Sequence, residues 1–367
     1  MNSPRANRPG GDKLKMSGGK KKVFVAISGG VDSSTAAALL LRAGFECAGV
    51  FMITNDRAAP AQHDAQEVTK KLGIKLYVLD LRDDFKQILE YFCSEYEKGR
   101  TPNPCVLCNR HIKFGKLWDF AKSKGAQFFA TGHYARVLNR NEQVGLYASV
   151  APAKDQSYAL SMIDRTILPH IILPMSDYSK DQTREMAAKF GLGTEHKAES
   201  QEICFIPNDD YVATLEQRCP ELVREGNIVD STGRILGKHN GAHRFTIGQR
   251  RGLRIAMGKP YYVVKIDAET NTVTLGPKQE LVHRKLLATG VNWLMDEPAS
   301  PFQAKVKIRY NDRGTPATVS PQGNGVAIEF DKPIPAITPG QLAVFYIQED
   351  QDSRVVGGGW IDKVTDQ

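Results

Sequence analysis

The sequence has no apolar run approaching the ~20 residues that a membrane-spanning helix needs, so no membrane segment is expected. Its basic N-terminus is not followed by the apolar stretch of a secretory signal peptide. Only six of the 367 residues are cysteine. We therefore expect a cytoplasmic protein, in which cysteines are more often catalytic, metal-binding or packing residues than structural disulfides.

Positive charge is scarcer in the body of the chain than the whole-chain value suggests. The net charge is +8, but residues 1–22 alone hold seven basic residues and one acid. We expect that tail to be a disordered basic extension. Residues 286–367 are acidic on balance. A nucleic-acid-binding surface therefore has to be sought locally and not inferred from the pI near 9.0.

Continuous apolar runs alternate with amphipathic stretches in the first half of the chain. Strands are expected at 23–27, 47–52, 75–79 and 127–131, and helices at 35–43, 61–72, 83–98 and 110–124. This alternation predicts an α/β fold with a parallel sheet and helices on both of its faces.

The pattern changes after residue 205, where one short helix near 208–218 precedes strand-and-turn sequence. Residues 286–365 read as several short strands divided by Gly and Pro, which is typical of a small β-barrel. The length fits two or three domains. The expected segments are the tail 1–22, an α/β domain 23–205, a small mainly-β central domain 206–285 and a C-terminal β-barrel 286–367.

A Ser/Gly-rich turn, Ser28-Gly29-Gly30-Val31-Asp32-Ser33-Ser34, stands between the first strand and the first helix. Its glycines permit close backbone approach, and its hydroxyls and the helix N-terminus can donate to phosphate oxygens. No lysine follows the glycines, so the Walker pattern does not apply. The turn resembles the PP-loop of ATP pyrophosphatases, and Asp32 is a candidate Mg²⁺ partner.

Two cysteines, Cys105 and Cys108, open the expected helix at 110, with Asn109 as a candidate cap. A helix N-terminus and the neighbouring Arg110 favour a thiolate. Cys204 lies at the junction between the α/β and β parts. The residues leave three interpretations open: thiol redox chemistry between Cys108 and Cys204, a metal or iron–sulfur site, or inert packing.

The other three cysteines, Cys47, Cys93 and Cys219, carry no motif. Cys47 falls in a strand and Cys93 in an apolar helix, so both are expected to be core residues, and Cys219 receives no assignment.

A basic segment without any acid spans residues 238–259, and its density of charge suits a phosphate backbone. Its members are Lys238, His239, His243, Arg244, Arg250, Arg251, Arg254 and Lys259.

Six motifs occur together and in order: S-G-G-V-D-S-S, G-R-T-P-N-P-x-x-x-C-N, T-G-H-Y-A-R, K-D-Q-S-Y, S-Q-x-I-C-F and F-T-I-G-Q-R-x-G-L. The set resembles the tRNA-specific 2-thiouridylases and covers nearly all of residues 23–362. The resemblance implies an adenine nucleotide alpha hydrolase-like fold. It also implies ATP-dependent adenylation of O2 of the wobble uridine in tRNAs for Lys, Glu and Gln, followed by replacement of that oxygen by sulfur.

By this resemblance Cys204 carries a persulfide and Cys108 is the second catalytic cysteine. The terminal sulfur of Cys204 attacks C2 directly, or Cys108 releases it as hydrosulfide; either route can leave a Cys108–Cys204 disulfide. Many members have Asp where this chain has Cys105. That difference makes an iron–sulfur cluster more plausible here, although none is expected.

The resemblance also implies the ligand contacts. ATP, with Mg²⁺, is expected at Ala26, Ile27, Ser28, Gly29, Gly30, Val31, Asp32, Ser33, Met52 and Gly132. The target base and the rest of the tRNA are expected at Asn103, Pro104, Cys105, His133, Lys154, Asp155, Gln156, Arg309, Tyr310 and Gln341. No protein metal ligand is expected.

The implied partners are tRNA and a persulfide donor, either a cysteine desulfurase or a relay protein. Two other classes stay open from the residues. A PP-loop ligase acting on a small molecule would use ammonia and need no cysteine pair. A non-catalytic iron–sulfur or zinc protein that binds RNA would hold metal at the cysteines.

Overall fold

The computed structural model describes residues 20–197, 203–253, 255 and 258–366. The expected disordered tail (residues 1–19 of it), Ser200, Gln201 and Glu202 of the Cys204 motif, and Arg254 of the basic segment lie outside these residues. The chain divides into two compact units, each described by itself: unit 1 comprises residues 1–83, 111–157 and 166–199, and unit 2 comprises 84–110, 158–165 and 200–367.

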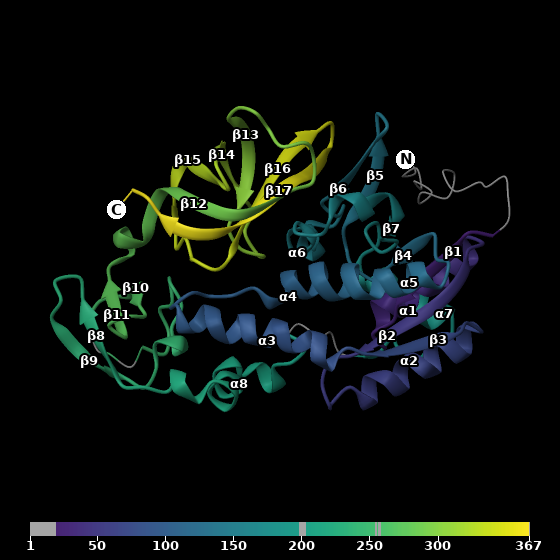
Figure 1. The fold of residues 1–367 in the computed structure, drawn as a ribbon, viewed down its shortest axis with the longest axis horizontal. Coiled ribbons are helices and arrows are strands. Elements are labelled where there is room, and N and C mark those ends of the chain that lie inside the picture. Colours follow the sequence, from purple (N-terminus) through teal and green to yellow (C-terminus); the bar gives the residue numbers. More distant parts are fainter. Residues whose placement is uncertain (1–19, 198–202, 254, 256–257, 367) are drawn as a thin grey trace, which may run out of the picture. The chain divides into compact units, whose positions relative to one another are not determined.

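Unit 1 is built on a parallel five-stranded sheet of order β3-β2-β1-β4-β7 (Figure 1). Its strands are β1 (Lys22–Ala26), β2 (Glu46–Ile53), β3 (Leu76–Asp80), β4 (Phe128–Ala130) and β7 (Ile171–Ile172). The expected parallel α/β sheet is confirmed. The chain order turns back between β1 and β4, and such a switch point is where open α/β sheets bind ligands.

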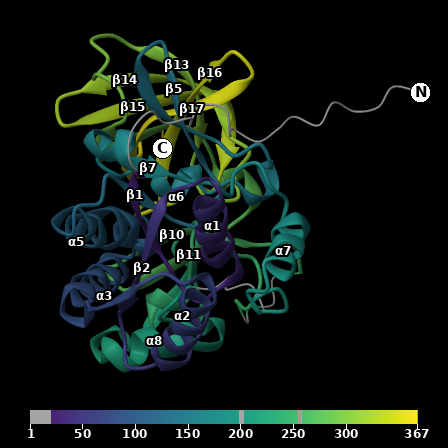
Figure 2. The same cartoon turned by 90° about the vertical axis from the view of Figure 1, so that its right-hand side faces the viewer.

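Both faces of the sheet are covered by helices, as Figure 2 shows. The helices of this unit are α1 (Val31–Arg42), α2 (Ala59–Leu72), α5 (Trp118–Ser123) and α7 (Lys180–Lys189). Val23 and Val25 of β1 share a core with Ala37 of α1. Phe24, between them, faces the opposite side, where its ring lies 6.2 Å from that of Phe120 in α5. Burial on both faces explains the continuous apolar run of β1.

Helix α1 starts four residues earlier than its expected start at Thr35. Gly30 is the extended N-cap, and the hydroxyls of Ser33 and Ser34 donate to its carbonyl at 3.2 and 2.8 Å. These bonds turn serines typical of a loop into first-turn helix residues. The hairpin β5 (Arg136–Arg140)–β6 (Gln143–Tyr147) and strand β7 were not predicted.

Unit 2 contains most of α3 (Arg82–Glu97) and the start of a long helical stretch. That stretch begins as α4 (Pro104–Leu107), becomes π-helical over Cys108–Leu117 and continues as α5. The helix therefore starts at Pro104 and not near 110. Asn109 is not a cap: its side chain is buried and donates to the carbonyl of Ala159 at 2.9 Å. Unit 2 also contains helix α8 (Tyr211–Arg218) and most of the short α6 (Ser157–Leu160).

A four-stranded sheet of order β10-β11-β8-β9 forms the central part of unit 2. Its strands are β8 (Gly226–Asp230), β9 (Ile235–His239), β10 (Tyr262–Asp267) and β11 (Thr272–Gly276). Ile228, Val263 and Leu275 form its buried core together with Phe245 from the connection between β9 and β10.

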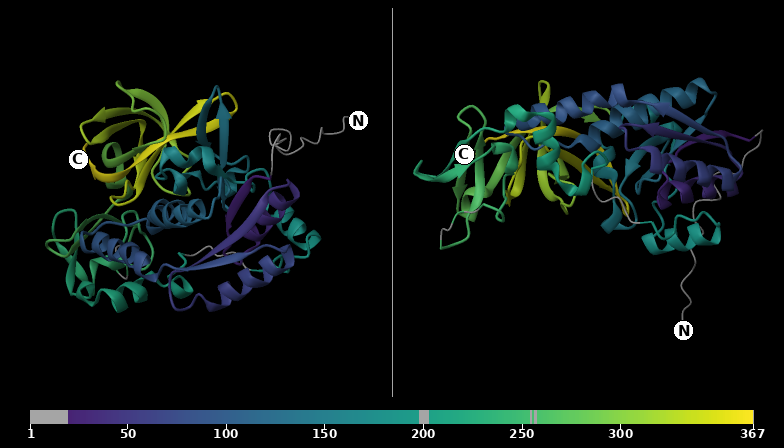
Figure 3. Two further views of the ribbon diagram at one scale, coloured as in Figure 1. Left: turned by 45° about the vertical axis from the view of Figure 1, so that its right-hand side comes forward. Right: turned by 90° about the horizontal axis from the view of Figure 1, so that it is seen from below.

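The C-terminal part of unit 2 is a six-stranded antiparallel barrel, closed by pairing of β12 with β17 (Figure 3). Its strands are β12 (Val282–Trp293), β13 (Phe302–Lys307), β14 (Thr315–Gln322), β15 (Gly325–Pro335), β16 (Leu342–Glu349) and β17 (Asp352–Val364). The predicted barrel is confirmed. The prediction of only short strands is wrong, since β12 and β17 have 12 and 13 residues. Register shifts between these two strands allow them to curve around the barrel.

Cys93 of α3 and Cys219, the residue after α8, form a disulfide with their Cα atoms 6.3 Å apart. The prediction of Cys93 as an inert core residue is therefore wrong. The local sequence could not reveal the pairing, because 126 residues separate Cys93 from its partner. Cys47 is partly buried and packs against the core of unit 1, and burial raises the pKa of its thiol to about 12. No helix within the described ranges is both long and apolar enough to span a bilayer.

Candidate functional site

Hydrogen bonds between Ser28 and Ser33 link the two ends of the phosphate loop. The Ser33 hydroxyl lies 3.0 Å from that of Ser28 and accepts the Ser28 backbone N–H at 3.1 Å. Ser28 is exposed, whereas Ser34 is fully buried and serves the first helical turn. Of the serines expected to face phosphate, Ser34 is therefore turned away into the helix.

Gly132 follows β4 and lies directly against the first turn of α1. A Cβ at position 132 would come within 2.7 Å of the Ser33 amide nitrogen and 2.8 Å of the Asp32 carbonyl carbon. Only glycine allows this approach. Met52 lies near the carboxyl end of β2, the strand next to β1. The structure thus brings the expected ATP-contact residues of three adjacent strands to one edge of the sheet.

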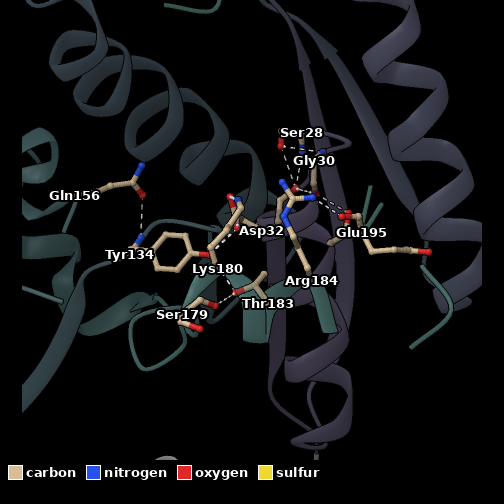
Figure 4. A network of polar contacts seen from close by, with 12 residues as sticks. Ser28, Gly30, Asp32, Tyr134, Gln156, Ser179, Lys180, Thr183, Arg184 and Glu195 are labelled. Carbon is tan, nitrogen blue, oxygen red and sulfur yellow. Dashed lines mark hydrogen bonds and ion pairs between the residues drawn. The ribbon is translucent and has the colours of Figure 1, made fainter. Parts of the chain in front are cut away.

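Asp32 is the centre of a polar network at the start of α1 (Figure 4). The Lys180 ammonium lies 2.8 Å from both carboxylate oxygens, and the Tyr134 hydroxyl donates to Oδ1 at 2.7 Å. Thr183 lies 3.1 Å from the same hydroxyl. A single carboxylate already paired with an ammonium does not make a magnesium site by itself, so the expectation of Asp32 as a Mg²⁺ ligand finds no support in this donor set.

The T-G-H-Y motif and residues 154–157 of K-D-Q-S-Y come together in unit 1. Gln156 accepts the Tyr134 backbone N–H at 2.9 Å, and buried Asp155 accepts the backbone N–H groups of Ser149 and Ser157 at 3.1 Å. Both side chains thus hold backbone in place. Burial lowers the pKa of His133 well below its usual value, so its ring is neutral at neutral pH.

In unit 2, Cys105 is exposed in the first turn of α4, and Cys108 is buried where the helix becomes π-helical. Wide π-helical turns occur often at functional sites. The exposed Arg110 follows.

Cys204 stands on a tight turn in which the Ile206 N–H donates to the Ile203 carbonyl at 2.8 Å. Its neighbour Phe205 is buried, with ring centroids 5.6 Å from Phe85 and 5.3 Å from Phe92 of α3. Because the buried ring of Phe205 holds this turn against α3, the neighbouring Cys204 is held in an exposed position.

The segment before α4 is fixed to the barrel. Gln341 Nε2 donates to the carbonyls of Thr101 and Pro102 at 3.0 and 3.3 Å, and the Thr101 N–H donates to the Pro339 carbonyl at 2.9 Å. Gly340 has φ +89°, and a Cβ there would lie 2.8 Å from the Thr101 carbonyl oxygen. Gln341, an expected tRNA contact, thus positions the residues before Asn103.

Tyr158 lies beside three of the expected base and tRNA contacts of unit 2, Asn103, Arg309 and Tyr310, and sequence reasoning missed it. Its buried hydroxyl donates to the Leu342 carbonyl at 3.0 Å and accepts from the Leu342 N–H at 3.2 Å. A hydrogen bond with the Asn103 side chain and the charge of Arg309 act on the same hydroxyl. Its ring lies 6.3 Å from exposed Tyr310. Its place in K-D-Q-S-Y was the only signal available.

Only some of the basic side chains of segment 238–259 are both exposed and outside the ion pairs described below. Arg244 pairs with Glu216 and Lys238 with Glu225, while His239 and His243 are buried. Arg250, Arg251 and Lys259 are exposed. Among the described residues, no three His, Cys, Asp or Glu side chains come together as metal ligands.

A phosphate loop at the switch point of a parallel sheet, followed by two β domains, defines a nucleotide-binding protein with an adenine nucleotide alpha hydrolase-like domain. Family comparison agrees, matching residues 21–208 to "tRNA methyl transferase HUP domain", 213–277 to "tRNA methyl transferase PRC-barrel domain" and 283–361 to "Aminomethyltransferase beta-barrel domain". The chain belongs to the tRNA-specific 2-thiouridylase family, as the resemblance in its motifs indicated.

Two relatives show that the chain is a member of this family. The chain is 45% identical, over 94% of its length and 98% of the relative's, to "tRNA-specific 2-thiouridylase MnmA" of Carboxydothermus hydrogenoformans. It is 46% identical, over 93% and 98%, to the protein of the same name from Syntrophotalea carbinolica. A solved 4-thiouridine synthetase–RNA complex with bound ATP overlaps 55% of this chain and 51% of its own at 20% identity, with a TM-score of 0.36.

Proposed function

We propose that the chain is a tRNA-uridine 2-sulfurtransferase, which uses ATP to exchange O2 of the wobble uridine for sulfur in tRNAs for Lys, Glu and Gln. The phosphate loop carries the proposal: Gly132 packs against the first turn of α1 at the switch point of the sheet. It does so in a chain 45% identical to a protein named for 2-thiouridylation.

The first step is adenylation of the base. O2 of the uridine attacks the α-phosphorus of ATP, an O–P bond forms, and the bond to pyrophosphate breaks. The carbonyl oxygen, a poor leaving group, can then depart as part of AMP. Backbone N–H groups at the start of α1 and its positive dipole end stabilise the phosphate charge. The proposed ATP contacts are Ala26, Ile27, Ser28, Gly29, Gly30, Val31, Asp32, Ser33, Met52 and Gly132.

The second step is sulfur transfer through two cysteines. Cys204, exposed on its turn, receives the sulfur as a persulfide. Either its terminal sulfur attacks C2 and Cys108 then cleaves the resulting S–S bond, or Cys108 attacks the persulfide first and releases hydrosulfide, which attacks C2. Both routes expel AMP and leave a Cys108–Cys204 disulfide, which a thiol reductant reopens with two electrons.

The three domains predicted from the sequence divide the remaining work. Residues 23–205 bind ATP, the central domain 206–285 contacts the tRNA backbone, and the barrel 286–367 supplies base-proximal contacts. The proposed tRNA contacts are Asn103, Pro104, Cys105, His133, Lys154, Asp155, Gln156, Arg309, Tyr310 and Gln341.

The remaining assignments concern the donor and the surroundings of the enzyme. The persulfide comes from a cysteine desulfurase or a relay protein, and the enzyme works in the cytoplasm. Mg²⁺ is proposed to enter with ATP, and no step is assigned to it through a protein ligand.

The proposal is tested with Cys108→Ser and Cys204→Ser, using Cys47→Ala as the matched control for loss of a thiol outside the motifs. Purified anaerobically and given ATP, persulfide and tRNA, both serine variants should form no 2-thiouridine, while the control keeps activity. Full activity of either serine variant contradicts the assigned roles. Ammonia-dependent product without tRNA would identify the small-molecule ligase instead, and a metal cluster essential for activity would replace the persulfide scheme.

A further inference from the structure

The phosphate loop contains no lysine of its own, yet the fold brings one to it. Lys180 is the first residue of α7, 148 positions after Asp32. Its ammonium contacts both carboxylate oxygens of Asp32 at 2.8 Å (Figure 4). Only 14% of the Lys180 side chain is exposed. A lysine this deeply buried beside a phosphate loop requires a function or a structural reason.

The position of Lys180 is fixed from both helices. Ser179 and Gln182 form a reciprocal capping box at the start of α7, which sets where its first residue lies. Val31 of α1 packs in one buried cluster with Ala187 of α7. Tyr134 bonds to Asp32, and Thr183 lies within hydrogen-bonding distance of the same hydroxyl. The ammonium is therefore preorganised at the N-terminus of α1.

A second lysine meets the other end of the loop. The Lys197 ammonium donates to the carbonyl of Gly29 at 3.1 Å and forms an ion pair with Asp64. Two ammonium groups and a helix N-terminus thus surround residues 29–32. Each ammonium is paired with a carboxylate, Asp32 or Asp64, so a polyphosphate that displaces the carboxylate gains a preorganised cation beside the helix N-terminus.

We propose that Lys180 binds the phosphate chain of ATP, on the part that leaves as pyrophosphate, and that Asp32 holds its ammonium at the loop until the nucleotide arrives. An ammonium supplied from α7 does what a lysine within the loop does in other phosphate loops. The inference rests on the proposed function for its ligand, ATP. The competing explanation is that the ion pair only fastens α7 to α1.

The test is equilibrium binding of pyrophosphate and of adenosine to the full chain by calorimetry. Loss of one charge-assisted contact predicts that Lys180→Met weakens pyrophosphate binding about tenfold to a hundredfold and leaves adenosine binding unchanged. Lys189→Met, an exposed lysine at the other end of α7, should change neither. Unchanged pyrophosphate binding in a less stable Lys180→Met protein overturns the proposal in favour of the purely structural ion pair.

A second measurement needs no variant and covers the case in which Lys180→Met does not fold. In the wild-type chain, pyrophosphate should slow acetylation of Lys180 and leave that of Lys189 unchanged, as read by peptide mass spectrometry. Equal acetylation of Lys180 with and without pyrophosphate refutes the contact. Neither readout involves tRNA, so a failure here is distinguishable from absence of 2-thiouridine formation by the wild-type protein.

Discussion

The hydroxyl of Tyr158 forms two hydrogen bonds with one residue, Leu342: it donates to the carbonyl and accepts from the N–H. Tyr158 belongs to the K-D-Q-S-Y motif, and Leu342 begins strand β16 of the barrel. Gln341, the residue before Leu342, donates to the carbonyls of Thr101 and Pro102, so Tyr158 anchors the chain next to the contact that holds the segment before Cys105 to the barrel.

Tyr158→Phe should therefore lower the free energy of unfolding by about 1–3 kcal/mol, since it leaves two buried backbone groups without their partner. The measurement is urea denaturation of the full chain, followed by intrinsic fluorescence. Tyr262→Phe, half-buried on β10, is the matched control and should change little. Equal stability of the two variants would show that the Tyr158 hydroxyl has no such role.

Gly340→Ala should destabilise the chain more than Gly323→Ala. Both glycines have positive φ, +89° and +52°, but only at position 340 would the new Cβ meet another residue, the Thr101 carbonyl oxygen at 2.8 Å. We expect a difference of about 1–2 kcal/mol between the variants in the free energy of unfolding. Indistinguishable denaturation curves would contradict the close packing of the 338–341 turn on Thr101.

Cys219→Ser should lower stability by about 2–4 kcal/mol, because the Cys93–Cys219 disulfide closes a long loop in the unfolded chain. Scanning calorimetry with and without dithiothreitol checks this. Reductant should shift the wild-type melting temperature to that of the variant and leave the variant unchanged. Cys47→Ala should keep the response to reductant, and a wild-type protein insensitive to reductant would contradict the disulfide.

Stability should fall as the pH drops below about 6.5. Burial lowers the folded-state pKa of His133 and of His239, so below the ordinary histidine pKa the unfolded chain binds protons that the folded chain does not. The stabilisation is full above pH ~6.5 and is lost toward the lower folded pKa, by up to ~1.4 kcal/mol per pH unit for His133. His133→Asn should flatten the melting-temperature profile between pH 5 and 7, whereas Asn at exposed His63 should not; identical slopes would contradict burial of His133.

Neutralising exposed Arg250, Arg251 and Lys259 as glutamines should weaken tRNA binding and reduce its salt dependence. Each lost phosphate contact lowers the slope of log K against log salt by about 0.7–0.9. Lys238→Gln, whose ammonium is paired with Glu225, should have a smaller effect. An unchanged slope in the triple variant would place the tRNA backbone elsewhere.

The parts of the fold that local sequence determines were predictable. Val23 to Ala26 is apolar without interruption because β1 is covered on both faces, and Gly132 follows a strand end as a ligand-proximal glycine should. The start of α1 was misplaced because Asp32, Ser33 and Ser34 are typical of turns. In the structure their side chains bond to Gly30, Lys180 and Tyr134, which lets them stand in the first turn of the helix.

The residues that sequence reasoning missed act over long separations. Lys180 meets Asp32 across 148 positions, Tyr158 meets Leu342 across 184, and Cys93 meets Cys219 across 126. Each pair is a product of tertiary packing, and a lone lysine, tyrosine or cysteine has no periodicity that reveals its partner. The motifs indicated which segments of the chain contain the candidate site residues. The distant residues that contact those segments became apparent only in the folded structure.

The most direct test of the central claim is the stoichiometry of the reaction. Wild-type protein is incubated anaerobically with ATP, a persulfide and unmodified tRNA, and nucleosides and nucleotides are quantified together by mass spectrometry. We expect one AMP and one pyrophosphate for each 2-thiouridine at the wobble position. Formation of ADP and phosphate, of a methylated nucleoside, or of AMP with no thiolated tRNA would contradict it.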